Sequence, residues 1–238
     1  MQPIFAIGDI HGQIDELHKA LGLVAQDEAE GPVLFIGDYV DRGPDSRAVI
    51  ELLLQGQADG RPWICLKGNH DKLLLDYLAD PHHDDPNIAR RLLYTEKPLG
   101  GRATLASYGV DVSEDRPLDD IHADALEAVP QAHRDWLAAL PLWHETEEHI
   151  FVHAGIRPGI PMERQEESDL LWIRGGFLED SRDHGKLVVH GHTALDAPQM
   201  YSNRLNIDGG AGYGRPLAPV LLLGREAFVL GPFGRARL

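Results

Sequence analysis

Polar side chains that bind cations follow three short apolar runs in the first third of the chain. Asp9 and His11 come after "PIFAIG", Asp38 comes after "VLFIG", and Asn69 comes after "WICLKG". Carboxylate, amide and imidazole ligands without any thiolate suit Mn²⁺, Fe²⁺, Fe³⁺ or Zn²⁺ better than they suit a structural zinc site. The sequence therefore predicts a cation site where these runs end.

Later segments add histidines at comparable places. His153 follows the apolar run "HIFV", while His190 and His192 end the run "KLVVHGH". Each motif alone has a simpler explanation, because an Asp after a strand is commonly a turn or helix cap and a lone His is commonly a core or loop residue. Residues two apart share a face of a strand, so both His190 and His192 could point inward. The combination of motifs, rather than any one of them, favours a site.

Parallel strands are expected to carry the first three motifs. Apolar residues between positions 14 and 24 recur with helical spacing, and a second helix is expected from about Ser46 to Gln55, with Gly56 as its stop signal. The three motifs begin 29 and 31 residues apart, about the length of a βαβ unit. The motifs would then meet beyond the carboxyl ends of adjacent strands, where open α/β sheets bind ligands.

The remaining segments predict a helical insert and a second sheet. Residues from about 80 to 128 include the loop-like "DPHHDDPN" and the helix-like "GGRATLASYG", and we interpret them as a helical insert or cap. The "HHDD" tract lies between Pro81 and Pro86, which favours a solvated loop. The runs "HIFVHAG", "KLVVHGHT", "RLNIDGG", "LAPVLLLG" and "AFVLG" predict a second, more antiparallel sheet. One domain over residues 1–238 is expected.

The composition is that of an acidic globular protein. The 238 residues are 43% hydrophobic and carry a formal net charge of −16, which argues against nucleic-acid or anionic-membrane partners. A lone Cys65 excludes an internal disulfide, and no apolar run approaches the roughly 18 residues of a membrane span. The N-terminus lacks a basic signal-peptide region, so a cytoplasmic location is expected. Any phosphate site must create its positive potential locally.

The motifs as a set resemble a known family. "GDIHG" (8–12), "GDYVDRG" (37–43), "GNHD" (68–71), "HAG" (153–155) and "GHT" (191–193) are similar to the phosphoprotein phosphatase family of calcineurin-like metallophosphoesterases, most closely its bacterial and phage-type serine/threonine protein phosphatase branch. "GGRATLASYG", "LLWIR" and "NIDGGAGYG" also resemble this branch. The resemblance implies an α-β-β-α sandwich of two mixed sheets flanked by helices. Asp71, where many relatives have Glu, and "IDGG" in place of "IDTG" are departures that remove no ligand.

The resemblance also implies a dinuclear metal centre. The first ion would be held by Asp9, His11 and Asp38, and the second by Asp38, Asn69, His153 and His192, with Asp38 as the bridge. The resemblance selects His192 rather than His190 as the ligand, and His190 would either pack within its strand or support the ligands from behind them. The implied cofactors are divalent ions, Mn²⁺ first, with Fe or Zn as alternatives.

Four residues outside the ligand set would take part in the reaction, together with the ligand Asn69. Arg42, Arg174 and Asn69 would bind phosphate. Asp41 would accept a hydrogen bond from His70 and favour its imidazolium form, which then protonates the leaving alkoxide. A metal-bound hydroxide would attack phosphorus. Two simpler alternatives stay open: a buried Asp41–Arg42 pair, and a surface ion pair for Arg174.

The function implied is hydrolysis of phosphoserine or phosphothreonine in proteins. The alternative within the same chemistry is cleavage of dinucleoside polyphosphates such as diadenosine tetraphosphate, and a phosphate-binding scaffold without activity is a third hypothesis. The expected partner is a phosphoprotein or a small phosphoester. "GGAGYG" lacks the spacing of a dinucleotide fingerprint, so no dinucleotide cofactor is expected.

Overall fold

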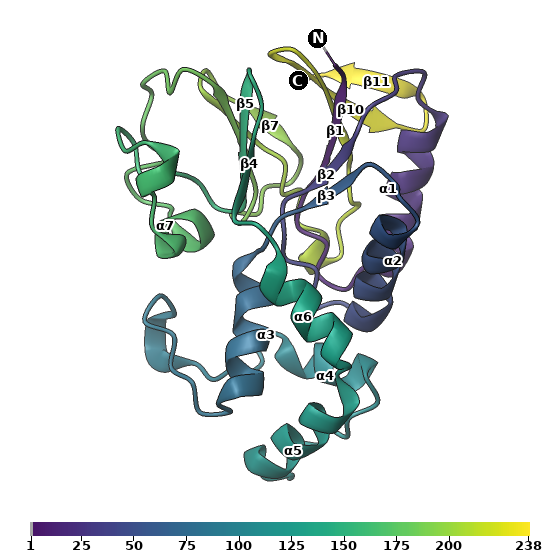
Figure 1. Cartoon of the computed structure of the whole chain (residues 1–238), viewed down its shortest axis with the longest axis vertical. Helices are drawn as coiled ribbons and strands as arrows, with labels where there is room; N and C mark the ends of the chain where they lie inside the picture. The colour runs from purple at the N-terminus through teal and green to yellow at the C-terminus, as the bar shows by residue number, and fades with distance from the viewer. Residues whose placement is uncertain (1) are drawn as a thin grey trace.

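Strands within residues 2–238, the part that the computed structural model describes, form two mixed sheets that face one another (Figure 1). The first sheet has the order β11-β10-β9-β1-β2-β3, in which β1, β2 and β3 are parallel. The second has the order β4-β5-β6-β8-β7, in which β5, β6 and β8 are parallel. The strands are β1 Ile4–Ile7, β2 Val33–Phe35, β3 Trp63–Cys65, β4 Trp143–Glu145, β5 His149–Val152, β6 Leu187–His190, β7 Gln199–Met200, β8 Arg204–Asn206, β9 Val220–Leu223, β10 Glu226–Gly231 and β11 Gly234–Arg237.

Helices cover the outer faces of both sheets. The first sheet is flanked by α1 and α2, the second by α7, and α3 to α6 lie beyond the carboxyl ends of β1, β2 and β3 (Figure 1). Their bounds are α1 Ile14–Gln26, α2 Ser46–Ala58, α3 Asn69–Ala79, α4 Gly101–Ser107, α5 Leu118–Ala128, α6 Gln131–Ala139 and α7 Glu167–Trp172, with 3-10 turns at Ala89–Arg91, Met162–Arg164 and Ala211–Tyr213. The predicted α-β-β-α sandwich is confirmed.

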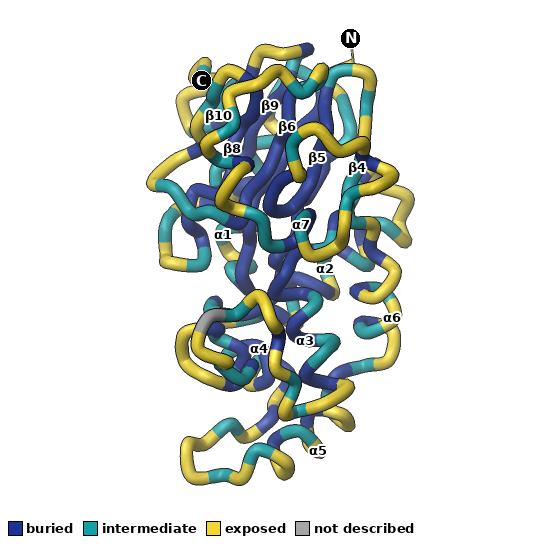
Figure 2. Tube along the Cα trace, turned by 90° about the vertical axis from the view of Figure 1, so that its left-hand side faces the viewer, coloured by how far each residue is buried: buried dark blue, intermediate teal, exposed yellow. Residues whose placement is uncertain are grey.

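Alternation along each strand divides the core into layers. In β1, Phe5 and Ile7 face the helices, whereas Ile4 and Ala6 face the second sheet. In β5, Phe151 joins the core between the sheets while its neighbours pack toward α7. Figure 2 shows these strands as the most deeply buried part of the chain. Because successive side chains of a strand point to opposite faces, each sheet is apolar on both sides.

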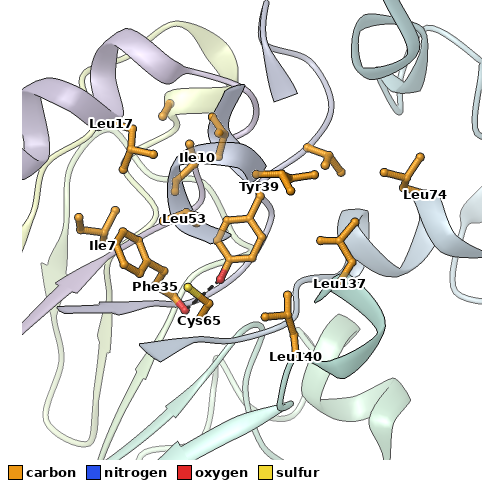
Figure 3. Packing of buried hydrophobic residues seen from close by; sticks show 14 of the residues in the cluster. Ile7, Ile10, Leu17, Phe35, Tyr39, Leu53, Cys65, Leu74, Leu137 and Leu140 are labelled. Carbon is orange, nitrogen blue, oxygen red and sulfur yellow. Dashed lines mark hydrogen bonds between the residues drawn. The ribbon is translucent and has the colours of Figure 1, made fainter. Parts of the chain in front are cut away.

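The core reaches from the sheets into the loops after β2 and β3. Tyr39 is fully buried, and its hydroxyl donates a hydrogen bond to the Leu66 carbonyl at 2.6 Å. Figure 3 shows Tyr39 among Ile10, Leu53 and Leu137, so side chains of α2 and α6 pack around the same ring. The packing of α6 thereby supports the loops that carry the predicted site.

Two details of the sequence-based expectation were wrong. The helix that begins at Ser46 does not stop at Gly56 but continues to Ala58. Gly56 serves packing instead of ending the helix, because a Cβ atom there would lie 2.0 Å from the Trp63 indole. The second sheet is not the more antiparallel one, since β9, β10 and β11 extend the first sheet through an antiparallel pairing of β9 with β1. The predicted helices at 14–24 and in "GGRATLASYG" are α1 and α4. The boundaries of a single domain and of an insert at 80–128 stay predictions.

Among the described residues, no helix has both the length and the apolarity needed to span a membrane.

The carboxylate of Asp71 fastens the loop after β2 to the loop after β3. Its Oδ2 accepts hydrogen bonds from the backbone N–H groups of Asp38 at 2.9 Å and Gly68 at 2.8 Å, and its Oδ1 accepts one from Tyr39 at 2.9 Å. Asp71 is completely buried, so water cannot replace its carboxylate as the hydrogen-bond acceptor of these N–H groups. The Asp that replaces Glu in this motif is therefore a structural link between two strand ends.

We expect Asp71→Asn to lower the free energy of unfolding by about 2–3 kcal/mol, because the amide NH₂ would face a buried backbone N–H donor. Urea unfolding measures this change. Asp76→Asn on the same helix is the control, since Asp76 makes a half-exposed pair with Lys72 worth under about 1 kcal/mol. Equal stabilities for the two variants would contradict the role given to Asp71.

Candidate metal centre

The predicted site residues meet at the carboxyl ends of the parallel strands of both sheets. Six elements position them: Asp9 and His11 come after β1, Asp38, Asp41 and Arg42 after β2, Asn69 and His70 at the start of α3, His153 after β5, His192 after β6, and Arg174 after α7. All of them except the two arginines are buried. Residues up to 183 positions apart are in direct contact here, as in the hydrogen bond from the His192 N–H to Asp9 Oδ2 at 3.1 Å.

Asp38 lies at the centre of the cluster. One carboxylate oxygen is 3.5 Å from His11 Nε2, and the other is 3.5 Å from His153 Nε2. Two groups of ligand-type atoms, each within 4.8 Å of one another, share this carboxylate: His11, Asp38 and His70, and Asp38, His153 and His192. A carboxylate with two such neighbourhoods can join two cations about 3.5–4 Å apart.

The second group has the donor atoms that a divalent ion requires. Asn69 Oδ1 lies 2.8 Å from both His153 Nε2 and His192 Nδ1. Asp38 Oδ1 lies 3.5 Å from the same His153 nitrogen. Carboxylate and amide oxygens together with imidazole nitrogens are ligands that divalent transition metals take. The donor set therefore fits a divalent cation.

The protonation of the histidines favours cation binding. Burial, with the neighbouring Arg42 guanidinium, lowers the pKa of His11 well below its usual value. The pKa of His192 is also well below its usual value, because the ring is buried and because His153 and Arg174 disfavour a further positive charge nearby. Both rings are thus neutral near pH 7, which is the form that ligates metal.

Asp9 has surroundings that the sequence did not indicate. Its carboxylate lies beside Asp208, and burial together with the charges of Asp208 and Asp38 raises the pKa of Asp9 well above its usual value. Burial also raises the pKa of Asp208, to about 6. Asp9 is absent from both ligand-type groups around Asp38, so its assignment to the first ion stays a prediction. Two adjacent buried carboxyl groups repel each other unless one is protonated or a cation lies between them.

Strained backbone conformations hold the cluster in place. His11, Asp38, Asp41, Arg42 and His192 all have positive φ angles, between 49° and 73°. Residues other than glycine adopt this conformation at a cost of about 1–3 kcal/mol each, and they concentrate at functional sites. Gly68 permits a close approach, because a Cβ atom there would lie 2.2 Å from Asp38 Oδ1.

Arg42 links the histidines on the open side of the cluster. Its Nη1 donates to His11 Nε2 at 2.7 Å and its Nη2 donates to His70 Nε2 at 2.9 Å. The guanidinium also lies 5.1 Å from the centre of the Tyr213 ring. Arg174 donates a hydrogen bond to the His192 carbonyl at 3.3 Å. It forms no ion pair among the described residues, so the alternative of a surface ion pair is not supported.

Asp41 pairs with His70 and not with Arg42. The two side chains join through a hydrogen bond of 2.7 Å between His70 Nδ1 and Asp41 Oδ2. The other oxygen, Oδ1, accepts hydrogen bonds from Tyr94 and Thr104. A buried pair of Asp41 with Arg42, the other alternative, is not formed.

Several residues around the site were not identified from the sequence. The segments "NIDGGAGYG" and "GGRATLASYG" resemble the family, but the sequence does not indicate which of their side chains reach the site. Those that do are Thr104, Asp208 and Tyr213, and a further one, Tyr94, lies outside both segments. His190 points elsewhere, with its Nε2 3.2 Å from the Arg204 guanidinium and its ring against Phe177.

The site opens into a cleft of about 320 Å³. Polar residues line its base, and Trp172, Tyr213, Leu92 and Leu99 form parts of its wall. Two larger hollows differ in lining: one of about 580 Å³ near Lys186 contains none of the predicted site residues, and one of about 600 Å³ includes Arg42 but no predicted metal ligand. Among these hollows, the predicted metal ligands line only the smaller cleft.

Comparisons with known proteins agree with this arrangement. Residues 2–212 match the family model of the calcineurin-like phosphoesterases. The symmetrical bis(5'-nucleosyl)-tetraphosphatase of Dechloromonas aromatica is 30% identical over 164 residues, which are 68% of this chain and 47% of that protein. The chain thus spans about half the length of this relative.

A second relative is covered almost completely. Serine/threonine-protein phosphatase 1 of Salmonella typhimurium is 26% identical over 223 residues, which are 90% of this chain and 89% of that protein. Among solved structures, a putative diadenosine tetraphosphatase superposes with a TM-score of 0.66 at 20% identity, covering 96% of this chain and 93% of that one. With the family model matched over most of its length, the chain belongs to the calcineurin-like phosphoesterase family.

Proposed function

We propose that this protein hydrolyses phosphoesters with two divalent cations, one held by Asp9, His11 and Asp38 and the other by Asp38, Asn69, His153 and His192. The observation that carries the proposal is the position of Asp38, whose two oxygens face histidines on opposite sides. Mn²⁺ is the proposed metal, and Fe or Zn would fit the same donors. When bound, such cations lower the pKa of water toward neutrality and offset the charge of the phosphate.

Arg42 is proposed to bind the phosphate group. In the structure its guanidinium donates to His11 and His70, and phosphate oxygens would compete for the same N–H groups. Once Arg42 turns to the phosphate, His70 Nε2 is free to carry a proton. Arg174, at the rim of the same cleft, supplies a second guanidinium.

His70 is proposed to protonate the leaving oxygen. Its Nδ1–H donates to Asp41, which fixes the ring and directs Nε2 toward the cleft. The negative charge of Asp41 stabilises the protonated ring until the proton passes from Nε2 to the alkoxide. After the transfer, Nε2 can again accept the hydrogen bond from Arg42 Nη2.

We propose phosphoserine and phosphothreonine in proteins as the substrates. One relative aligns with 90% of this chain, and it is named a serine/threonine-protein phosphatase. A second candidate, a dinucleoside polyphosphate, is favoured by Tyr213, whose side chain is 64% exposed at the cleft and could stack on a base. Relatives named bis(5'-nucleosyl)-tetraphosphatases point the same way.

We expect His70→Asn to lower kcat for an alkyl phosphate about 10²–10⁴-fold, because a poor leaving group depends on the general acid. An activated aryl phosphate should be affected much less. Steady-state assays of the Mn²⁺-loaded protein test both substrates, with His82→Asn as a control because His82 is an exposed loop residue. Unchanged turnover of the alkyl ester would exclude His70 as the acid.

Tyr213→Ala separates the two substrate classes. If adenine stacks on this ring, KM for diadenosine tetraphosphate should rise roughly 5- to 160-fold, from about 1–3 kcal/mol per stacked base. KM for a phosphopeptide should change much less, because only the contact of Tyr213 with Arg42 is lost. Phe233→Ala, which removes a fully exposed aromatic residue at the β10–β11 turn, is the control. We expect the larger kcat/KM of the unmodified protein for the phosphopeptide, and a strong preference for the dinucleotide would overturn that assignment.

A further inference from the structure

The carboxylate of Asp41 is held by more hydrogen bonds than its pairing with His70 requires. Its Oδ2 accepts from His70 Nδ1 at 2.7 Å. Its Oδ1 accepts from the Tyr94 hydroxyl at 2.5 Å and from the Thr104 hydroxyl at 2.7 Å. Asp41, Tyr94 and Thr104 are all buried, so no water can replace these donors.

Thr104 holds the backbone of Asp41 as well as its side chain. The Asp41 N–H donates to Thr104 Oγ1 at 2.7 Å and to Ser46 Oγ at 3.1 Å. Asp41 has a φ angle of 73°, in the left-handed region that a residue with a side chain adopts only at a cost. The two hydroxyls therefore support a strained conformation that turns the carboxylate toward His70.

Tyr94 is itself kept in the form that donates. Burial, together with the Asp41 carboxylate, raises the pKa of Tyr94 well above its usual value, so its hydroxyl keeps its proton. Its ring packs against Tyr77 with the ring centres 5.0 Å apart. In addition, the Arg42 N–H donates to the Gly100 carbonyl at 3.3 Å, within the same segment that carries Tyr94 and Thr104.

We propose that Tyr94 and Thr104 are positioning residues for catalysis, which hold the Asp41 carboxylate so that His70 presents its Nε2 to the leaving oxygen. The segment beyond α3 thereby becomes a working part of the active site. The inference rests on the proposed function, because it assigns the two residues to the proton transfer made by His70. The side-chain hydrogen bonds of Tyr94 and Thr104 go to Asp41 and Ser46, and among the described residues none goes to a proposed metal ligand or to a phosphate-binding arginine.

The first test compares Tyr94→Phe with Tyr77→Phe in the metal-loaded full chain. Each change removes one hydroxyl from a buried tyrosine, but only the Tyr77 hydroxyl lacks a hydrogen-bond partner among the described residues. We expect Tyr94→Phe to lower kcat for an alkyl phosphate about tenfold, with a smaller loss for an activated aryl phosphate. Tyr77→Phe should leave both rates unchanged.

Thr104 is tested in the same assay by two substitutions. Thr104→Val removes both hydrogen bonds with Asp41 and should lower kcat for the alkyl phosphate at least as much as Tyr94→Phe does. Thr104→Ser keeps the hydroxyl and should restore most of the rate. If Thr104→Val does not fold, Tyr94→Phe and Thr104→Ser still decide the question, and a large loss in Thr104→Ser would count against the proposal.

A combination with His70→Asn shows whether the residues act through His70. Since changes within one catalytic unit are not additive, Tyr94→Phe should cause no further loss when His70 is already absent. The same tenfold loss in both backgrounds would overturn the inference and leave the role of His70 intact. The inference would also be wrong if Tyr94→Phe lowered kcat while His70→Asn alone left kcat unchanged.

A spectroscopic measurement keeps the test independent of activity. The chain is loaded with diamagnetic Zn²⁺, and the Nδ1–H proton of His70 should give a downfield NMR signal. The signal is assigned by its loss in His70→Asn. Tyr94→Phe should shift this signal and Tyr77→Phe should not. If the unmodified protein hydrolyses no ester, the proposed function fails, and a signal unmoved by Tyr94→Phe would still overturn the positioning role.

Discussion

The arrangement depends on how the chain holds one carboxylate, that of Asp38, between two sheets. Strand β2 lies between β1 and β3, so the loop that follows it faces the loops of both neighbours. Asp71 fixes that loop from α3, and Gly68 allows the close approach that a larger residue would prevent. Backbone strain at Asp38 and its neighbours is therefore offset by buried hydrogen bonds and by packing around Tyr39. Every proposed ligand is positioned relative to this loop.

Charge is organised locally in a strongly acidic protein. The net charge of −16 would repel phosphate, and the cluster itself contributes the buried carboxyl groups of Asp9, Asp38 and Asp208. Arg42 and Arg174 offset part of that charge, and cations bound at Asp38 would offset the rest. The neutral histidines fit this account, because burial favours their uncharged form and leaves lone pairs for ligation. The proposed phosphate site and the proposed metal site are thus parts of one cluster.

The strand ends and their motifs could be predicted, because hydrophobic periodicity marks β1, β2 and β3 and the spacing of Asp9, Asp38 and Asn69 matches βαβ units. Contacts between distant segments could not. Tyr94 lies 53 positions and Thr104 lies 63 positions from Asp41, and neither has a sequence pattern that indicates the contact. The pairing of β9 with β1 also depends on the tertiary fold. The sequence predicts a helix stop at Gly56, because nothing in the sequence indicates that this glycine contacts Trp63.

Metal stoichiometry tests most directly whether Asp38 is shared between two cations. Equilibrium dialysis of the unmodified chain against Mn²⁺, followed by elemental analysis, should find two ions per chain. Asp38→Asn should weaken both sites together, because the amide removes the shared negative charge. Asp135→Asn, at an exposed position on α6 that pairs only with Gln131 among the described residues, should retain both ions. If Asp38→Asn kept one ion at unchanged affinity, or if the unmodified chain bound a single ion, the shared-carboxylate account would be wrong.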